Sequence, residues 1–101
     1  MQDATFAPYG SVYLIGTTPV QVLTTNNVNP TSYRIRCLVT GYISWGPNSG
    51  VPTPTAPTAG VPSPTTLGMS AGGIETFTLP PNGYFQSSNA AGFEVIAGEG
   101  V

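Results

Sequence analysis

The chain has 101 residues, which suits one domain and is too short for two. Only 6% of these residues are charged, namely two arginines and four acidic residues, and lysine and histidine are absent. We therefore expect neither nucleic acid nor a membrane as a partner. Two cations cannot neutralise a run of phosphates, and no segment is apolar over the length of a bilayer.

Catalytic groups are also scarce in this sequence. Without histidine and lysine the common general bases are missing. The carboxylates belong to Asp3, Glu75, Glu94 and Glu99, and no two have the spacing of a metal-binding loop or a glycosidase pair. We expect that the protein is not an enzyme and holds no cofactor or metal. Its low charge suits either a neutral free surface or one buried against partners, where charge costs desolvation energy.

In chain order, segments rich in Val, Ile, Thr, Tyr and Phe alternate with turns rich in Gly, Pro and Asn, and no segment keeps helical spacing. This pattern predicts an all-β fold, a single small β-sandwich or jelly-roll domain over residues 1–101. The predicted strands are residues 11–15, 20–25, 32–40, 42–45, 74–79, 84–86 and 93–97. Residues 42–45 form either a separate strand or the preceding strand continued past a bulge.

Alternation within these segments separates core side chains from outer ones. The predicted core positions are Tyr33, Ile35, Cys37, Val39, Phe77, Leu79, Tyr84, Phe85 and Phe93. Cys37 is the only cysteine, and we interpret it as a small buried hydrophobe, with a reactive thiol as the alternative. Trp45 ends its strand, and we interpret it as a core or rim residue, with an interface anchor as the alternative.

A proline- and threonine-rich repeat separates the fourth and fifth predicted strands. Residues 50–55 read GVPTPT, and residues 60–65 repeat them as GVPSPT. The prolines exclude a helix and a central strand, which leaves polyproline II or irregular extended chain. We expect residues 47–66 to form an arm that projects from the domain at little cost in stability. The arm is either a tolerated loop or a segment that lies along a neighbouring surface.

Arg34 and Arg36 are the only cations, and alternation places both on the outer face of one strand. Like charges there repel each other unless an opposite charge lies close by. Either Glu75 or Glu94 supplies that charge across the sheet, or a carboxylate of a partner does. The residues that we expect at a partner interface are Arg34, Arg36, Trp45, Val51, Pro52, Pro54, Pro57, Val61, Pro62 and Pro64.

Two stretches of the chain resemble a known class of protein. Residues 72–101, GGIETFTLPPNGYFQSSNAAGFEVIAGEGV, contain a strand, a Leu-Pro-Pro-x-Gly-Tyr turn, a loop of small residues and a last strand with a Gly-Glu-Gly tail. Residues 32–46, SYRIRCLVTGYISWG, contain an arginine-bearing strand followed by one that ends near an aromatic residue. Together these stretches are similar to small β-sandwich head decoration, or cement, proteins of tailed bacteriophages. The proline-rich arm departs from that pattern.

The resemblance implies a homo-oligomer, a dimer or trimer, that binds the major capsid protein on the outer surface of the virion and reinforces the shell. Synthesis in the host cytoplasm is expected, because the start MQDATFAPYG lacks the pattern of a signal peptide. The alternative function is a carbohydrate- or receptor-binding module of a phage tail or secreted protein, with Tyr42, Trp45 and Tyr84 as a stacking platform. Another virion part, such as a tail or head–tail connector component, is a further alternative.

Overall fold

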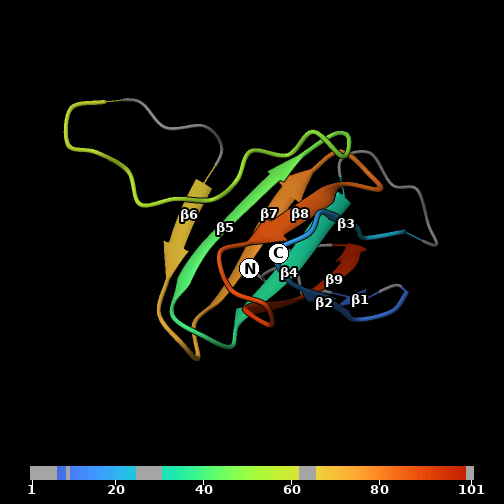
Figure 1. Cartoon of the computed structure of the whole chain (residues 1–101). Coiled ribbons are helices and arrows are strands. Elements are labelled where there is room, and N and C mark those ends of the chain that lie inside the picture. The colour runs from blue at the N-terminus through green and yellow to red at the C-terminus, as the bar shows by residue number, and fades with distance from the viewer. Residues whose placement is uncertain (1–6, 9, 25–30, 62–65, 100–101) are drawn as a thin grey trace, which may run out of the picture.

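The computed structural model describes residues 7–8, 10–24, 31–61 and 66–99 (Figure 1). Every regular element within these ranges is a β-strand, and no helix there is long and apolar enough to cross a membrane. The strands are β1 (Ala7–Pro8), β2 (Tyr13–Ile15), β3 (Val20–Gln21), β4 (Thr31–Cys37), β5 (Gly41–Gly46), β6 (Thr66–Met69), β7 (Ile74–Leu79), β8 (Tyr84–Ser87) and β9 (Phe93–Glu99). They form two antiparallel sheets, so the predicted all-β sandwich is confirmed.

The order of the strands is that of a jelly roll. Sheet A runs β1-β9-β4-β7, with β2 also paired to β9, and sheet B runs β3-β8-β5-β6. If β1 and β2 are counted as one interrupted strand, the first strand pairs with the last, β3 with β8, β4 with β7 and β5 with β6. This nested antiparallel pairing is a long hairpin rolled into two sheets, which is how a jelly roll is built.

The core lies between the two sheets. Its fully enclosed side chains are Ile15, Val22, Tyr33, Ile35, Cys37, Ile43, Phe85, Phe93, Val95 and Ala97. The prediction for β4 is confirmed over most of its length, because the burial of this strand alternates as a sheet with one covered face requires. Phe77 and Leu79 are partly buried and pack against this core, also as predicted. Tyr84 is only half-buried.

The prediction for Val39 is wrong, because this side chain is exposed. Strand β4 ends at Cys37, and the amides of Leu38 and Val39 both donate to the carbonyl of Gly92, at 2.7 and 3.2 Å. The chain then crosses to the other sheet, where β5 is a separate strand rather than a continuation of β4. Alternation holds only while a strand stays paired in its sheet. The pairing of β4 ends at Cys37, so the alternation no longer applies at Val39, two residues later.

Other strand limits differ from the prediction by a few residues. Strand β2 begins two residues later than expected, and β9 runs two residues further. Strand β3 ends at Gln21, and residue 25 of the predicted strand lies outside the described residues. Strands β1 and β6 were not predicted, because one has two residues and includes a proline, and the other contains a glycine in four residues.

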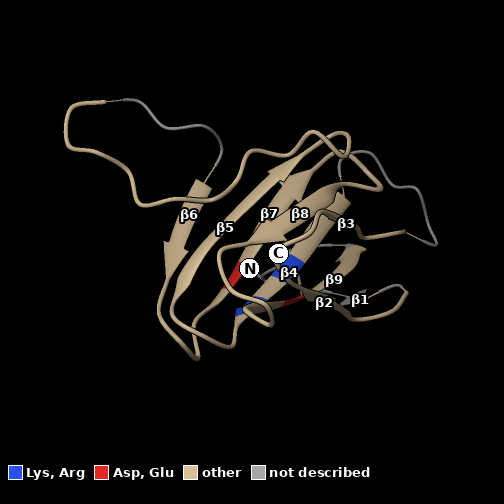
Figure 2. Ribbon diagram, in the orientation of Figure 1, with Lys and Arg blue, Asp and Glu red and all other residues tan. Residues whose placement is uncertain are grey.

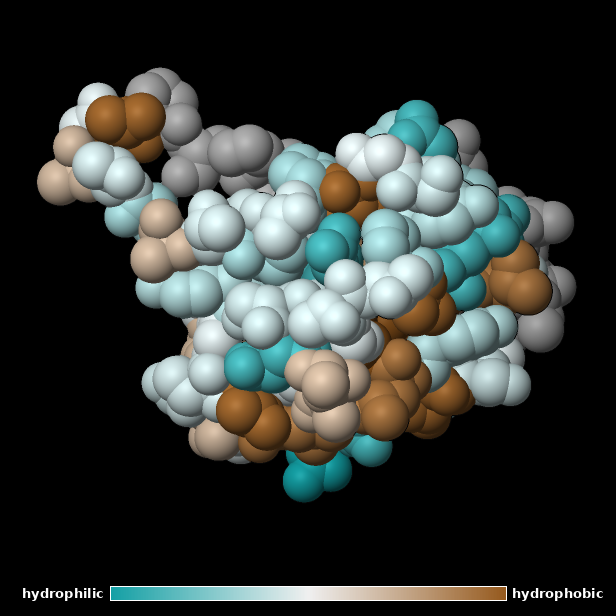
Figure 3. Space-filling view, in the orientation of Figure 1, coloured by the Kyte–Doolittle hydropathy of each residue, from teal (hydrophilic) through white to brown (hydrophobic). Residues whose placement is uncertain are grey.

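The proline-rich arm is anchored along its first part. We call residues 51–54 the stem. Val51 is only 8% exposed, Pro54 is buried, and the Ser44 hydroxyl on β5 donates a hydrogen bond to the carbonyl of Pro52. Residues 55–61, which we call the tip, are exposed and extend past β6 (Figures 1 and 3). Within the described part of the expected arm over residues 47–66, the tip projects, whereas the stem packs on sheet B and residue 66 begins β6; residues 62–65 lie outside the described residues.

Candidate functional site

An apolar hollow of about 290 Å³ opens at one end of the sandwich, between the two sheets. Its walls come from the last residues of β5, the end of β7 with the turn that follows, and the start of β8. The lining residues are Trp45, Gly46, Pro47, Leu79, Pro80, Pro81, Gly83 and Tyr84. None of these residues is charged. The indole of Trp45 is held by the Phe77 ring, with centroids 5.1 Å apart and planes tilted by 55°.

The turn at residues 80–83, which forms one wall of the hollow, is tied to the core from below. The Tyr33 hydroxyl donates to the Pro80 carbonyl at 2.7 Å and accepts from the Gly83 amide at 3.0 Å. Asn82 adopts the left-handed conformation, with φ of 57°, which asparagine tolerates better than most residues. Its carboxamide oxygen accepts from the Thr24 amide at 3.0 Å. The wall is therefore held at several points, so the hollow keeps its shape before anything binds.

Burial raises the pKa of the Tyr33 phenol above its usual 10.0, although the hydrogen bond from Gly83 works in the opposite direction. Tyr33 is therefore a neutral structural clamp. The Tyr84 hydroxyl, by contrast, makes no hydrogen bond within the described part of the chain, and its ring lines the hollow. The site thus combines two aromatic rings, several prolines and one hydroxyl that can donate or accept. This lining suits apolar rings and one hydrogen-bonded carbonyl better than an ion.

A second candidate surface is the outer face of sheet A. The register places Arg36 between Glu94 on β9 and Ile74 on β7, and places Leu14 of β2 beside Glu94. Arg36 Nη1 lies 3.5 Å from Glu94 Oε1. Leu14 and Ile74 are 55% and 56% exposed, so an apolar side chain stands on each side of the ion pair. We call Leu14, Arg36, Ile74 and Glu94 the sheet A patch. Figure 2 shows that the described charges gather on β4, β7 and β9.

The register also shows which carboxylate pairs with Arg36. Glu94 is directly opposite Arg36, whereas Glu75 is opposite Ile35 and belongs to the other side of the pleat. The pairing of Arg36 with Glu94 is the cross-strand alternative that the sequence left open. Both side chains stay largely exposed, so the bond between them contributes little to stability.

The structure distributes the expected interface residues over different surfaces. Arg34 and Arg36 lie on the outer face of sheet A, whereas the stem lies on the outer face of sheet B, over Ser44. Ser44 faces outward because its strand neighbour Ile43 is in the core. Val51 and Pro54 are buried in their own molecule. Of the remaining arm residues, Pro57 and Val61 are exposed, Pro52 is half-buried, and Pro62 and Pro64 lie outside the described residues.

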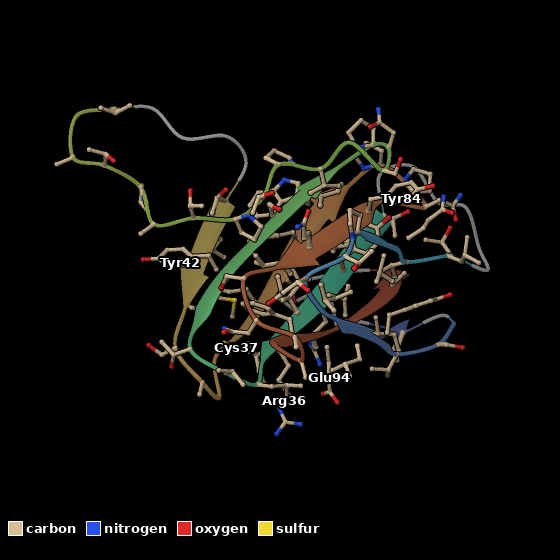
Figure 4. All side chains as sticks on the ribbon, viewed as in Figure 1. Arg36, Cys37, Tyr42, Tyr84 and Glu94 are labelled. Atoms are coloured by element: carbon tan, nitrogen blue, oxygen red, sulfur yellow. The ribbon has the colours of Figure 1, made fainter. Side chains whose placement is uncertain are left out.

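The three aromatic residues considered for a stacking platform do not share one surface. Trp45 and Tyr84 line the same hollow. Tyr42 lies on another part of sheet B, where it lines a shallow depression with Gly68 and Met69. Figure 4 shows Tyr42 and Tyr84 at opposite ends of the molecule. The hollow therefore offers two aromatic rings and the prolines beside them.

Cys37 is buried, as predicted, with 1% of its surface exposed. Burial raises the pKa of its thiol above the usual value of 9.0, against the effect of backbone hydrogen bonds from Val39 and Gly41. The thiol donates to the Val39 carbonyl at 3.2 Å. Because the thiolate is the reactive form, this cysteine is held in its unreactive state.

Sequence reasoning missed the prolines of the hollow and the apolar residues of the sheet A patch. Pro80 and Pro81 were interpreted only as a turn, although two prolines that follow a strand offer an apolar wall. Leu14 and Ile74 could have been found by alternation, because each is an apolar residue on the outward side of its strand. Among the described residues, no group of His, Cys, Asp and Glu side chains is arranged to hold a metal.

No protein-family model, curated protein or solved structure matches this chain.

Proposed function

We propose that this protein is a capsid decoration protein that binds the outside of an assembled phage head and stabilises it by bridging major capsid subunits. The observation that carries the proposal is a jelly roll with very few charges whose surface still exposes large apolar side chains. Jelly rolls serve in viral capsid proteins and in lectins, so the fold admits this function without requiring it. A surface of hydroxyls and amides is cheaper to desolvate than one covered with charges.

The sheet A patch is the surface that we assign to the capsid. Leu14 and Ile74 supply apolar contact area on the two sides of the Arg36–Glu94 pair, and the pair supplies charges that a partner's side chains can join. Protein interfaces combine apolar contact area with polar and charged groups, and the patch offers both. A homodimer or homotrimer presents the patch more than once and so gains from avidity.

Stabilisation then follows from mass action. A protein that binds assembled shells but not free subunits lowers the free energy of the shell by an amount set by its affinity and its concentration. The function requires no catalytic group.

The test is cosedimentation of the purified protein with expanded tailed-phage capsids that lack decoration. The wild-type chain is expected to sediment with the capsids, and the double variant Leu14→Ser/Ile74→Ser is expected to remain in the supernatant. The matched control is Leu23→Ser, because Leu23 is 53% exposed and lies near β3 in the other sheet. Failure of the wild-type chain to bind any such capsid, or loss of binding in the control alone, contradicts the proposal.

The second candidate function is a carbohydrate- or receptor-binding module, and the hollow is the observation that favours it. Trp45 and Tyr84 present aromatic surface beside the Tyr84 hydroxyl, which suits the apolar face of a sugar ring. A glycan screen followed by titration of the Trp45 fluorescence distinguishes this function from capsid binding. A glycan that saturates the hollow, together with no capsid binding, supports the module.

A further inference from the structure

The repeat in the arm contains two copies of one docking sequence, and the structure shows how the first copy docks. Residues 50–55 and 60–65 differ by a single Thr-to-Ser change. In the first copy Val51 and Pro54 are buried, and the carbonyl of Pro52 accepts a hydrogen bond from Ser44. Residues 61, 62 and 64 of the second copy are again Val, Pro and Pro.

The second copy begins without the burial that the first one has. Val61 is 58% exposed, against 8% for Val51 at the same place in the first copy. The second copy therefore has the same Val-Pro-x-Pro residues that dock the first copy, and its valine is exposed. An exposed valine at the end of a neutral arm is a candidate for contact with another surface.

The hollow at the end of the sandwich fits such a segment. Proline-rich chains in the polyproline II form are bound by grooves that are lined with aromatic side chains, because the chain is already extended and loses little entropy. Trp45 and Tyr84 supply the aromatic walls of the hollow. Its volume of about 290 Å³ suits one or two side chains rather than a large ligand.

The hollow and the second copy of the repeat also match in charge and in hydrogen-bonding groups. The lining of the hollow contains no charged residue, and residues 47–66 contain none either, so no charge is buried on docking. The first copy docks with one hydroxyl-to-carbonyl hydrogen bond, from Ser44 to Pro52. The Tyr84 hydroxyl, which has no partner within the described residues, can supply the equivalent bond to a carbonyl of the second copy.

The position of the tip favours docking into another molecule. The tip leaves the body past β6, an edge strand of sheet B (Figure 1). The hollow lies at the ends of β5 and β7 and at the start of β8. The stem holds the arm on sheet B at one end, and β6 holds it at the other. We propose that residues 60–65 of one copy of this chain dock into the Trp45–Tyr84 hollow of a second copy.

This contact joins two different surfaces, so it produces either closed rings, the smallest of which is a reciprocal exchange of arms between two copies, or open chains of copies. It does not rest on capsid binding, because the hollow and the arm lie apart from the sheet A patch. Neighbouring decoration molecules linked in this way form a continuous layer if the proposed function also holds.

The first experiment is a titration of the full-length protein with a synthetic peptide of residues 50–66. Trp45 is the only tryptophan, and the peptide has no aromatic residue, so the emission of Trp45 reports occupancy of the hollow directly. We expect a saturable shift in emission. Tyr84→Ala should weaken binding by about tenfold or more, as loss of an aromatic contact at the centre of an interface does. Tyr42→Ala is the matched control and should bind as the wild type does.

Peptide variants keep this test valid if the Tyr84 variant folds poorly. A peptide with the valine and the first proline of both copies replaced by alanine leaves the protein unchanged and should lose the emission shift. No shift with the wild-type peptide at millimolar concentration overturns the proposal. A shift produced by a glycan, in the absence of one from the peptide, also overturns it and assigns the hollow to sugar binding.

The second experiment tests whether the contact joins two molecules. One variant lacks residues 56–65 and keeps its hollow, and the other is Tyr84→Ala and keeps its arm. We expect each variant alone to sediment as a smaller species than the wild type, and an equimolar mixture to recover a complex of one copy of each. A wild-type chain that stays monomeric up to millimolar concentration, or a mixture that forms no complex, contradicts docking between copies.

Discussion

The buried hydroxyl of Tyr33 provides the sharpest test of how the hollow is held. The change Tyr33→Phe keeps the ring, which packs edge-on against Phe85 with centroids 5.2 Å apart, and removes only the oxygen. That oxygen bonds both the Pro80 carbonyl and the Gly83 amide. Pro80 is exposed, so water can replace the lost partner of its carbonyl, whereas Gly83 is buried and its amide is left without one.

The free energy of unfolding is expected to fall by about 2 kcal/mol, because each neutral hydrogen bond contributes about 0.5–1.5 kcal/mol and a buried unpaired amide costs more than the bond itself. In a domain of this size each kcal/mol lowers the Tm by roughly 4–8 °C. Denaturant titration and calorimetry measure both quantities. The control is Tyr42→Phe, whose hydroxyl makes no hydrogen bond within the described residues, and its effect should stay within about 0.5 kcal/mol.

The same change alters the dependence of stability on pH. Burial raises the pKa of Tyr33 in the folded state above the unfolded value near 10.0. The unfolded chain therefore loses this proton first as the pH rises. The stability that the protonated Tyr33 phenol contributes is fully present below pH 10 and is lost as the pH rises towards the folded pKa. Wild-type stability should fall more steeply than that of Tyr33→Phe above pH 10. Equal stability of the two proteins at neutral pH, with parallel pH profiles, would refute the role of the clamp.

Three further predictions concern the stem, the ion pair and the thiol. Ser44→Ala removes the bond to the Pro52 carbonyl and should cost about 1 kcal/mol in denaturant titration, with faster amide exchange in the stem; unchanged exchange there contradicts the anchor. Arg36→Ala should change the free energy of unfolding by less than about 1 kcal/mol, because its pair with Glu94 is exposed, and should still weaken cosedimentation with capsids. A variant that binds normally but melts much lower contradicts this role. Cys37, buried and protonated, should react with a thiol-directed disulfide reagent at pH 8 only as fast as the protein unfolds, whereas rapid labelling of the folded chain rules out its burial.

Local patterns predicted the fold class and much of the core. Strand β7 has the predicted limits, and the alternation in β4 placed Tyr33, Ile35 and Cys37 inward, because a side chain's face depends only on its neighbours within one strand. The same rule failed at Val39, where the chain leaves sheet A. Alternation carries no information on where a strand stops pairing.

The candidate sites depended on long-range placement. The sequence grouped the arginines with the arm as one interface, but they lie on opposite faces of the sandwich. Nothing local shows that Val51 is covered while Val61, in the second copy of the same motif, is exposed, because the cover of Val51 comes from the outer face of β5, on which the first copy lies. The hollow joins residues that are more than thirty positions apart in the chain, so its lining could not be read from any single segment.

By itself, the sequence determined an all-β domain with a neutral surface, a single buried cysteine and an arm that is neither helix nor central strand. These properties follow from side-chain type, spacing and the backbone limits of proline, which act over a few residues. Only the tertiary structure decided the jelly-roll pairing, the choice of Glu94 as the partner of Arg36, and the meeting of Trp45 with Tyr84. Those depend on register between distant strands, which is fixed when the two sheets pack their apolar faces together.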